Sequence, residues 1–106
     1  METPRIVLPT SFLEFEWISS PEAVSLYIYL LLTASSGENM IFGNQVHRGQ
    51  VLTLRSSLMR ELGISSQKIT TAIRRLIDAD CISLDKIRKY YLITLKRYDD
   101  YSAIPK

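Results

Sequence analysis

The chain has 106 residues, 46% of them hydrophobic and 23% charged, with four Gly, four Pro and a formal net charge of +2 at pH 7. This length suits one domain over residues 1–106, and the composition excludes an intrinsically disordered, collagen-like or linker-like chain. The longest apolar stretch, residues 23–34, is shorter than the roughly 20 residues that a bilayer-spanning helix needs, so the sequence predicts no membrane segment.

Residues 1–18 contain two prolines and an aromatic cluster, which predicts an irregular N-terminal arm held down by its aromatic side chains. The aromatic residues of the arm are Phe12, Phe15 and Trp17. A helix should follow and run to about residues 34–36. Pro21 suits its first position, where no N–H is needed, and Gly37 can end it. The candidates for its cap are Ser19 and Ser20.

This helix is apolar on nearly all sides. One face is formed by Val24, Ile28, Leu31 and Leu32, and the other sides carry Tyr27, Tyr29 and Leu30. A helix of this kind must be covered on several sides. The cover could come from the aromatic arm or from a second subunit, and in the second case we expect a homodimer formed through Tyr27, Tyr29 and the arm.

Residues 37–49 are expected to form a polar loop, and the β-rich run over residues 51–54 predicts a strand. A short helix should begin after a cap at Ser56 or Ser57 and end at Gly63. Its apolar residues are Leu58, Met59 and Leu62.

A longer helix is predicted over residues 66–79. Its apolar residues recur at spacings of three and four and are Ile69, Ala72, Ile73, Leu76 and Ile77. The turn before it suits a tight connection between helices, because Gly63 can take a positive φ, Ile64 can pack inward and Ser65 can cap. Residues 56–79 therefore predict a helix-turn-helix.

Two alternating runs, residues 81–84 and 90–95, predict strands joined by residues 85–89. A β-hairpin that directly follows a helix-turn-helix is called a wing, so residues 81–95 predict a wing hairpin. The expected fold class is therefore α+β: a winged helix-turn-helix with three helices, a small antiparallel β-sheet and a C-terminal wing hairpin.

The buried stripe of the longer helix leaves a polar side facing outward. In DNA-binding helix-turn-helix proteins the second helix enters the major groove, where amide and hydroxyl groups contact bases and cations contact phosphates. The predicted DNA-binding residues are Gln67, Thr70 and Thr71 for bases, and Lys68, Arg74 and Arg75 for phosphates. The alternative is an ordinary amphipathic helix with a solvated face.

The tip of the predicted wing brings three cations together. They are Lys86, Arg88 and Lys89, and a basic wing commonly touches phosphates or the minor groove beside the site of the helix. The alternative is that these residues only keep the edge of the hairpin from pairing with another chain. If the helix and the wing both engage DNA, affinity should fall steeply with added salt.

The small net charge hides a strong asymmetry along the chain. Residues 1–47 carry one base and five acids, a net charge of −4, whereas residues 48–97 carry eleven bases and four acids, a net charge of +7. Such a distribution suits contact with a polyanion, of which nucleic acid is the commonest, unless the charges merely solvate different faces.

The sequence offers little for catalysis, and we expect no enzyme, no cofactor and no metal site. The single histidine, His47, lies in the polar loop without a nearby partner in sequence, and Cys81 opens an apolar strand and is expected to be a buried thiol. One cysteine and the lack of an evident signal peptide favour a cytoplasmic protein.

Four segments together resemble the winged-helix domain of phage and bacterial replication-initiation proteins, the DnaD-like primosomal proteins and the phage O-like initiators. The segments are Gly49–Thr53, Leu58–Ser65, Ala72–Leu76 and Tyr91–Leu95, the last leading to Tyr98-Asp99-Asp100-Tyr101. The resemblance covers residues 17–102. It implies DNA binding in replication initiation, contacts with other replication proteins and self-association. The family usually has Asn where Arg97 stands and a further C-terminal region, so the chain is a stand-alone version or a fragment.

The leading hypothesis is thus a protein that binds double-stranded DNA in replication initiation. A transcriptional regulator of the same fold shares this chemistry. A different class of function is a winged-helix module for protein–protein interaction or dimerisation, which the apolar helix over residues 23–34 favours.

Overall fold

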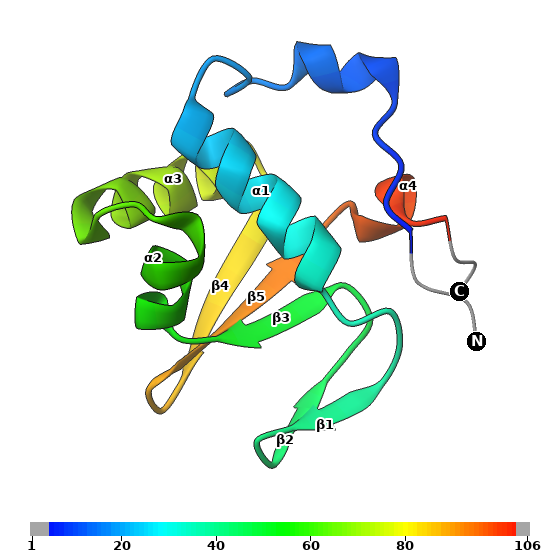
Figure 1. The fold of residues 1–106 in the computed structure, drawn as a ribbon. Coiled ribbons are helices and arrows are strands. Elements are labelled where there is room, and N and C mark those ends of the chain that lie inside the picture. Colours follow the sequence, from blue (N-terminus) through cyan, green and yellow to red (C-terminus); the bar gives the residue numbers. More distant parts are fainter. Residues whose placement is uncertain (1–4, 104–106) are drawn as a thin grey trace.

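The structure, a computed structural model, describes residues 5–103, so the first four residues of the predicted arm lie outside it. Within this range, four α-helices and two small antiparallel sheets form an α+β fold (Figure 1). The helices are α1 (Pro21–Thr33), α2 (Arg55–Leu62), α3 (Ser66–Asp78) and the short α4 (Tyr98–Tyr101), preceded by a 3-10 helix, η1 (Thr10–Glu14). The strands are β1 (Asn39–Ile41), β2 (Asn44–Val46), β3 (Gln50–Thr53), β4 (Ile82–Ile87) and β5 (Tyr90–Leu95).

The core forms between the helices and one face of a three-stranded sheet. The strand order is β3-β5-β4 with both pairs antiparallel, and β1 and β2 form a separate hairpin beside it. The sheet contributes Val51, Ile82, Ile93 and Leu95 to the same buried cluster as the inner side chains of α1, α2 and α3. No helix in the part of the chain that the structure describes has the length and apolar character to cross a membrane.

The start of α1 is as predicted. Ser20 is the cap, with its Oγ accepting a hydrogen bond from the Ala23 amide, and Pro21 occupies the first helical position. The residues of α1 that are buried are Ala23, Leu26, Tyr27, Leu30 and Leu31, whereas Leu32, on the apolar face described from the sequence, is 65% exposed. Periodicity could not select the buried face because apolar residues surround the helix.

The N-terminal arm supplies the cover for one side of α1. The arm was predicted to be irregular, but it contains the 3-10 helix η1, which places two aromatic rings against α1. Phe12 and Phe15 stack on Tyr27 at centroid distances of 6.2 and 5.6 Å, and Tyr101 meets Tyr27 edge-on at 5.9 Å. Tyr27 is 1% exposed, so it cannot contribute to a contact with a second copy, and Tyr29 is half-buried.

The segment predicted as a polar loop, residues 37–49, contains the β1–β2 hairpin. Ile41 pairs with Asn44 across a two-residue turn, in which Phe42 and Gly43 have φ values of 51° and 76°. Asn-Gly is the usual sequence of such a turn, and each strand is only three residues long. The segment therefore carried no strong hairpin signal.

The α2–α3 pair matches the sequence prediction except at its start. α2 begins at Arg55 with Leu54 as its cap, two residues before the predicted serines, and Leu54 offers no side-chain hydrogen bond. α2 ends at Gly63 in the left-handed conformation, and the Ser65 Oγ accepts from the Lys68 amide to cap α3. The turn geometry follows from glycine's tolerance of positive φ and from serine capping.

A close approach joins the start of β3 to the end of the described chain. Gly49 has a φ of 82°, and a Cβ built on it would lie 3.1 Å from the Tyr98 Cβ. The Arg48 guanidinium lies 5.1 Å from the centre of the Tyr98 ring, and Arg48 Nε donates to the Asp99 carboxylate at 2.8 Å. The start of the Gly49–Thr53 segment and the Tyr98–Tyr101 segment, both of which carry the resemblance, therefore lie in contact, and this contact stabilises the fold.

We expect Gly49→Ala to lower the free energy of unfolding by about 2–4 kcal/mol, because its Cβ would press on Tyr98 from a left-handed backbone position. Gly43→Ala is the matched control, since Gly43 has a similar φ but open space around it, and it should cost about 1 kcal/mol. Urea unfolding of both variants measures the difference. Equal losses would contradict a role for the Tyr98 contact.

Candidate nucleic-acid interface

α3 turns one line of side chains directly away from the core. Its inner stripe is buried and consists of Ile69, Ala72, Ile73 and Leu76. At 3.6 residues per turn, Gln67, Thr71 and Arg74 lie opposite this stripe, and all three are exposed. Arg74 forms no ion pair or side-chain hydrogen bond within residues 5–103. We call these three residues the outer line of α3; Asp78 continues it in the last turn.

On the side of α3 toward the sheet, Arg55 ties three elements together. From α2, its guanidinium donates to the Ser66 Oγ at 2.9 Å and to the Ser66 carbonyl at 2.5 Å. It also donates to the Thr70 hydroxyl and, at 3.4 Å, to the Tyr91 hydroxyl on β5. Thr70, predicted to contact bases, is therefore held in this internal network.

A shallow cavity of about 250 Å³ separates α3 from the β4–β5 hairpin. Ile73, Arg74 and Ile77 line it from the helix, and Leu84 and Tyr91 line it from the hairpin. Of the outer line of α3, Arg74 lines this cavity and so flanks one surface with the hairpin, whereas Gln67 and Thr71 do not line it. Its lining is mainly apolar, and the charged residues in it are Arg55 and Arg74.

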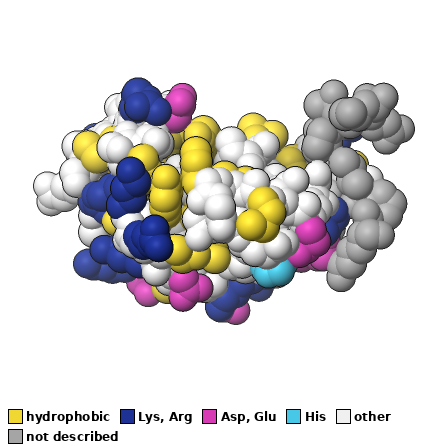
Figure 2. Space-filling view, turned by 90° about the horizontal axis from the view of Figure 1, so that it is seen from below, with side chains coloured by type: hydrophobic (Ala, Val, Ile, Leu, Met, Phe, Trp, Pro, Cys, Tyr) yellow, Lys and Arg dark blue, Asp and Glu magenta, His cyan; other side chains and the backbone are white. Residues whose placement is uncertain are grey.

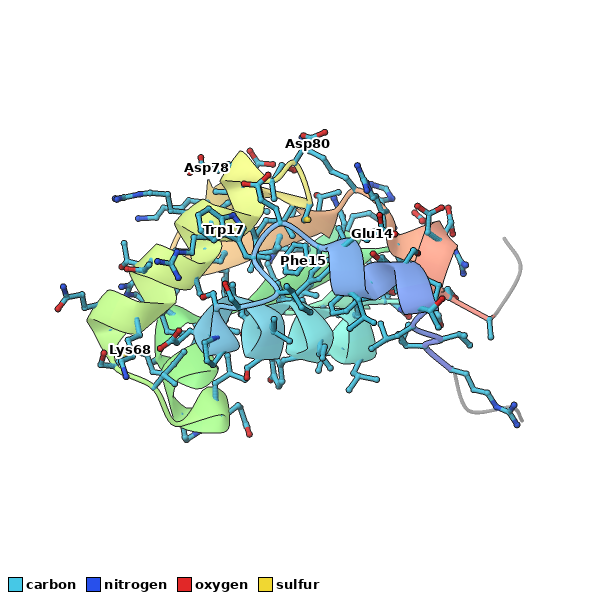
Figure 3. All side chains as sticks on the ribbon, turned by 90° about the horizontal axis from the view of Figure 1, so that it is seen from above. Glu14, Phe15, Trp17, Lys68, Asp78 and Asp80 are labelled. Carbon is cyan, nitrogen blue, oxygen red and sulfur yellow. The ribbon has the colours of Figure 1, made fainter. Side chains whose placement is uncertain are left out.

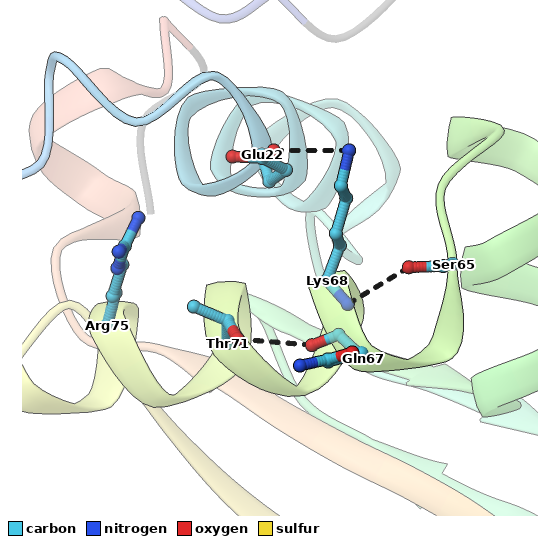
Figure 4. A pocket seen from close by; sticks show the side chains of 6 residues that line it. All are labelled: Glu22, Ser65, Gln67, Lys68, Thr71 and Arg75. Atoms are coloured by element: carbon cyan, nitrogen blue, oxygen red, sulfur yellow. Dashed lines mark hydrogen bonds and ion pairs between the residues drawn. The ribbon is translucent and has the colours of Figure 1, made fainter.

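On the side of α3 toward α1, the predicted cations contact the protein itself. Lys68 Nζ lies 3.8 Å from the Glu22 carboxylate. The Arg75 guanidinium lies 4.8 Å from the centre of the Trp17 ring and donates to the Ser20 Oγ at 2.7 Å. Together with Ser65, Gln67 and Thr71 these residues surround a hollow of about 350 Å³, and Lys68 and Arg75 stand on its two sides (Figure 4).

The position of the arm explains why Arg75 differs from its neighbour. Figure 3 shows Trp17 lying against α3, with Lys68 near the start of the helix and Asp78 near its end. Residues 74 and 75 are about 100° apart around the helix axis, so one points outward and the other toward the arm. The sequence analysis grouped both as phosphate contacts because it could not place the arm.

The β4–β5 hairpin is longer than predicted and its turn is shorter. β4 extends to Ile87, which leaves Arg88 and Lys89 as the two turn residues, with φ of 58° at Arg88. Lys86 Nζ lies 5.6 Å from the Tyr91 ring centre, and Lys89 Nζ lies 5.6 Å from that of Tyr90. The three predicted cations are exposed, and none of them forms an ion pair within the described residues.

Figure 2 shows the molecule from below, on the side toward which both hairpins project in Figure 1. Lys and Arg side chains gather at one end of this face, the end at which α2, α3 and the β4–β5 hairpin lie. The cationic area is smaller than the net charge of residues 48–97 implied. Arg48 pairs with Asp99, and Lys96 lies 2.5 Å from Asp80, whose pKa this contact lowers. Arg55 and Arg75 are also used inside the fold.

His47 and Cys81, the two residues considered for catalysis, both interact with other parts of the protein. His47 contacts Glu38 at the base of the β1–β2 hairpin, and this hydrogen bond holds the pKa of the Glu38 carboxyl below its usual range. Cys81 is buried, as predicted, and burial raises the pKa of its thiol. Within residues 5–103, no three His, Cys, Asp or Glu side chains gather as a metal site would require.

The sequence analysis did not identify two residues that line the cavity between α3 and the β4–β5 hairpin, namely Arg55 and Tyr91. Arg55 was missed because it was placed before the helix, and Tyr91 because it was treated only as a strand residue. No signal in the sequence pairs Arg55 with residues 11 to 36 positions away. Comparison of the chain with protein-family models, with characterised proteins and with solved structures finds no match.

We expect Arg75→Ala to lower the free energy of unfolding by about 1–2 kcal/mol, because it removes a cation–π contact and a hydrogen bond. Arg74→Ala, the neighbouring control, should change it by less than about 0.5 kcal/mol, as is usual for exposed positions. Urea unfolding followed by the fluorescence of Trp17 measures both. The assignment of Arg75 to the fold fails if the two variants are equally stable.

Proposed function

We propose that this protein is a winged-helix protein that binds double-stranded DNA, with α3 in the major groove and the β4–β5 hairpin as a basic wing on the backbone. Support comes from the order of the elements. A tight turn joins α2 to α3, an antiparallel hairpin follows α3 directly, and β3 pairs with β5 to complete the sheet. In this arrangement the helix after the turn is the one that enters the groove.

The observation that carries the proposal is that Arg74, in the exposed outer line of α3, lines the same cavity as the hairpin that carries the exposed cations. Gln67, Thr71 and Arg74 form the outer line of α3, and the hairpin beyond the cavity carries Lys86, opposite Tyr91 in the strand register. Gln and Thr can bond to base edges, and the cations can bind phosphates on either side. Arg74, Lys86, Arg88 and Lys89 are not neutralised by an acidic partner among the described residues.

Lys68, Thr70 and Arg75 have a different part in the proposal. Their present contacts lie within the protein, so we assign them to the shape of the interface and to its margin rather than to direct base contact. A duplex phosphate reaching the hollow beside Lys68 would have to compete with Glu22, which weakens its contribution.

We propose replication initiation, in the cytoplasm and together with other replication proteins, as the process that this binding serves. This part rests on the resemblance of the Gly49–Thr53 and Tyr98–Tyr101 segments to DnaD-like and phage O-like initiators. A transcriptional regulator would use the same surface. Self-association is a second candidate, favoured by exposed apolar residues on the arm, namely Val7, Leu8 and Leu13.

The test is fluorescence anisotropy with a labelled duplex over a series of salt concentrations. We expect Arg74→Glu and Arg88→Glu each to weaken binding by about tenfold, since each places an acid where a phosphate contact is proposed. Neutral substitution of either arginine should reduce the slope of log affinity against log salt by about 1.

Arg97→Glu is the matched control because it makes the same change of charge elsewhere. Arg97 lines a hollow beside Phe12 and Glu14, on the arm side of the molecule. It should leave duplex affinity within about threefold of the original protein, given screening over a Debye length of about 10 Å. Affinity that ignores salt, or that falls equally in all three variants, would refute the proposal.

A further inference from the structure

The tips of the two hairpins meet through a pair of aromatic rings. Phe42, at the turn of the β1–β2 hairpin, stacks on Tyr90, the first residue of β5, with ring centroids 5.3 Å apart and an interplanar angle of 11°. Both hairpins project toward the same side of the molecule (Figure 1). Phe42 and Tyr90, which are 48 positions apart in the chain, thereby build one surface, and neither residue is part of the proposed duplex contact.

Phe42 occupies a backbone conformation that phenylalanine disfavours. Its φ of 51°, next to 76° at Gly43, is the pattern of a type I′ turn, where Asn or Gly is favoured at the first position. A bulky side chain in this region is strained. The ring recovers little by burial, because Phe42 is 71% exposed. Strain of this kind, at an exposed tip and without core packing, points to a functional contact.

The surroundings of Phe42 indicate the chemistry of that contact. Met40, on β1 two positions before Phe42, is 66% exposed. The other ring of the pair, Tyr90, has the Lys89 ammonium 5.6 Å from its centre. We call Met40, Phe42 and Tyr90 the aromatic platform. Figure 2 shows hydrophobic side chains on this face beside the group of Lys and Arg side chains.

We infer that the aromatic platform binds single-stranded nucleic acid, with an unpaired base stacked against Phe42 and a neighbouring phosphate held by Lys89. Flat rings beside cations are the general means of binding single strands. Duplex DNA does not offer a free base face, because its bases are stacked on one another. The cations favour a polyanion over an uncharged apolar protein segment as the occupant. This inference does not rest on duplex binding by α3.

The test uses fluorescently labelled oligo-dT and oligo-rU of about 12 nucleotides, a length within the range that single-strand-binding domains cover. Phe42→Asn removes the ring and creates the Asn-Gly turn that hairpins prefer, so the variant should fold at least as stably as the original protein. We expect it to bind both oligonucleotides about tenfold more weakly, as the loss of one stacked base predicts. Phe42→Trp keeps a flat ring and should retain binding within about threefold.

Leu32→Asn is the matched control, because it removes an apolar side chain that is 65% exposed on α1. It should leave oligonucleotide affinity unchanged. Binding to either oligonucleotide that depends on Phe42 supports the inference. The inference is overturned if neither binds, if Phe42→Asn binds as well as the original protein, or if Leu32→Asn loses as much.

Duplex binding is measured in parallel with Arg74→Glu, so the two proposals fail separately. A protein whose duplex affinity is lost in Arg74→Glu but whose oligonucleotide affinity ignores Phe42 supports the duplex interface and overturns this inference. The opposite pattern supports the aromatic platform alone. Sedimentation completes the test: a dimer that Phe42→Asn dissociates without any change in oligonucleotide affinity would identify a second copy as the occupant.

Discussion

The structure depends on the need to cover α1 on more than one side. This helix is apolar nearly all round, so no single neighbour can bury it, and the remaining elements are arranged about it. The other helices and the sheet pack on its inner side, and the rings of Phe12 and Phe15 cover another side by stacking on Tyr27. This packing sets the orientation of α3, whose own buried stripe then decides which side chains face outward.

Basic residues in this protein have two distinct uses. Arg48, Arg55 and Arg75 lie over aromatic rings or donate to hydroxyl and carbonyl groups of distant segments, and so they hold the fold together. Arginine suits this use because its planar group offers several donors at once. Arg74 and Arg88 lie outside these networks. A charge count along the chain cannot separate the two groups, yet only the second is available for the phosphate contacts that we propose.

The two proposed surfaces are neighbours on one side of the molecule. The β4–β5 hairpin belongs to both, since Tyr91 lines the cavity next to α3, with Lys86 over its ring, while Tyr90 stacks on Phe42. A single hairpin could thus contact a duplex on one side and an unpaired strand on the other. Such a geometry suits a place where double-stranded and single-stranded regions adjoin, which connects the two proposals without making either depend on the other.

Local chemistry in the sequence determined the starts of α1 and α3 and the end of α2, since a serine cap, Pro21 or the left-handed Gly63 acts within one helical turn. The α+β class followed from these signals. Only the tertiary structure decided which face of α1 is buried, that residues 39–46 form a hairpin, and that Arg75 faces the arm whereas Arg74 faces outward. These outcomes depend on segments that are far apart in the chain, and their contacts leave no trace in local periodicity.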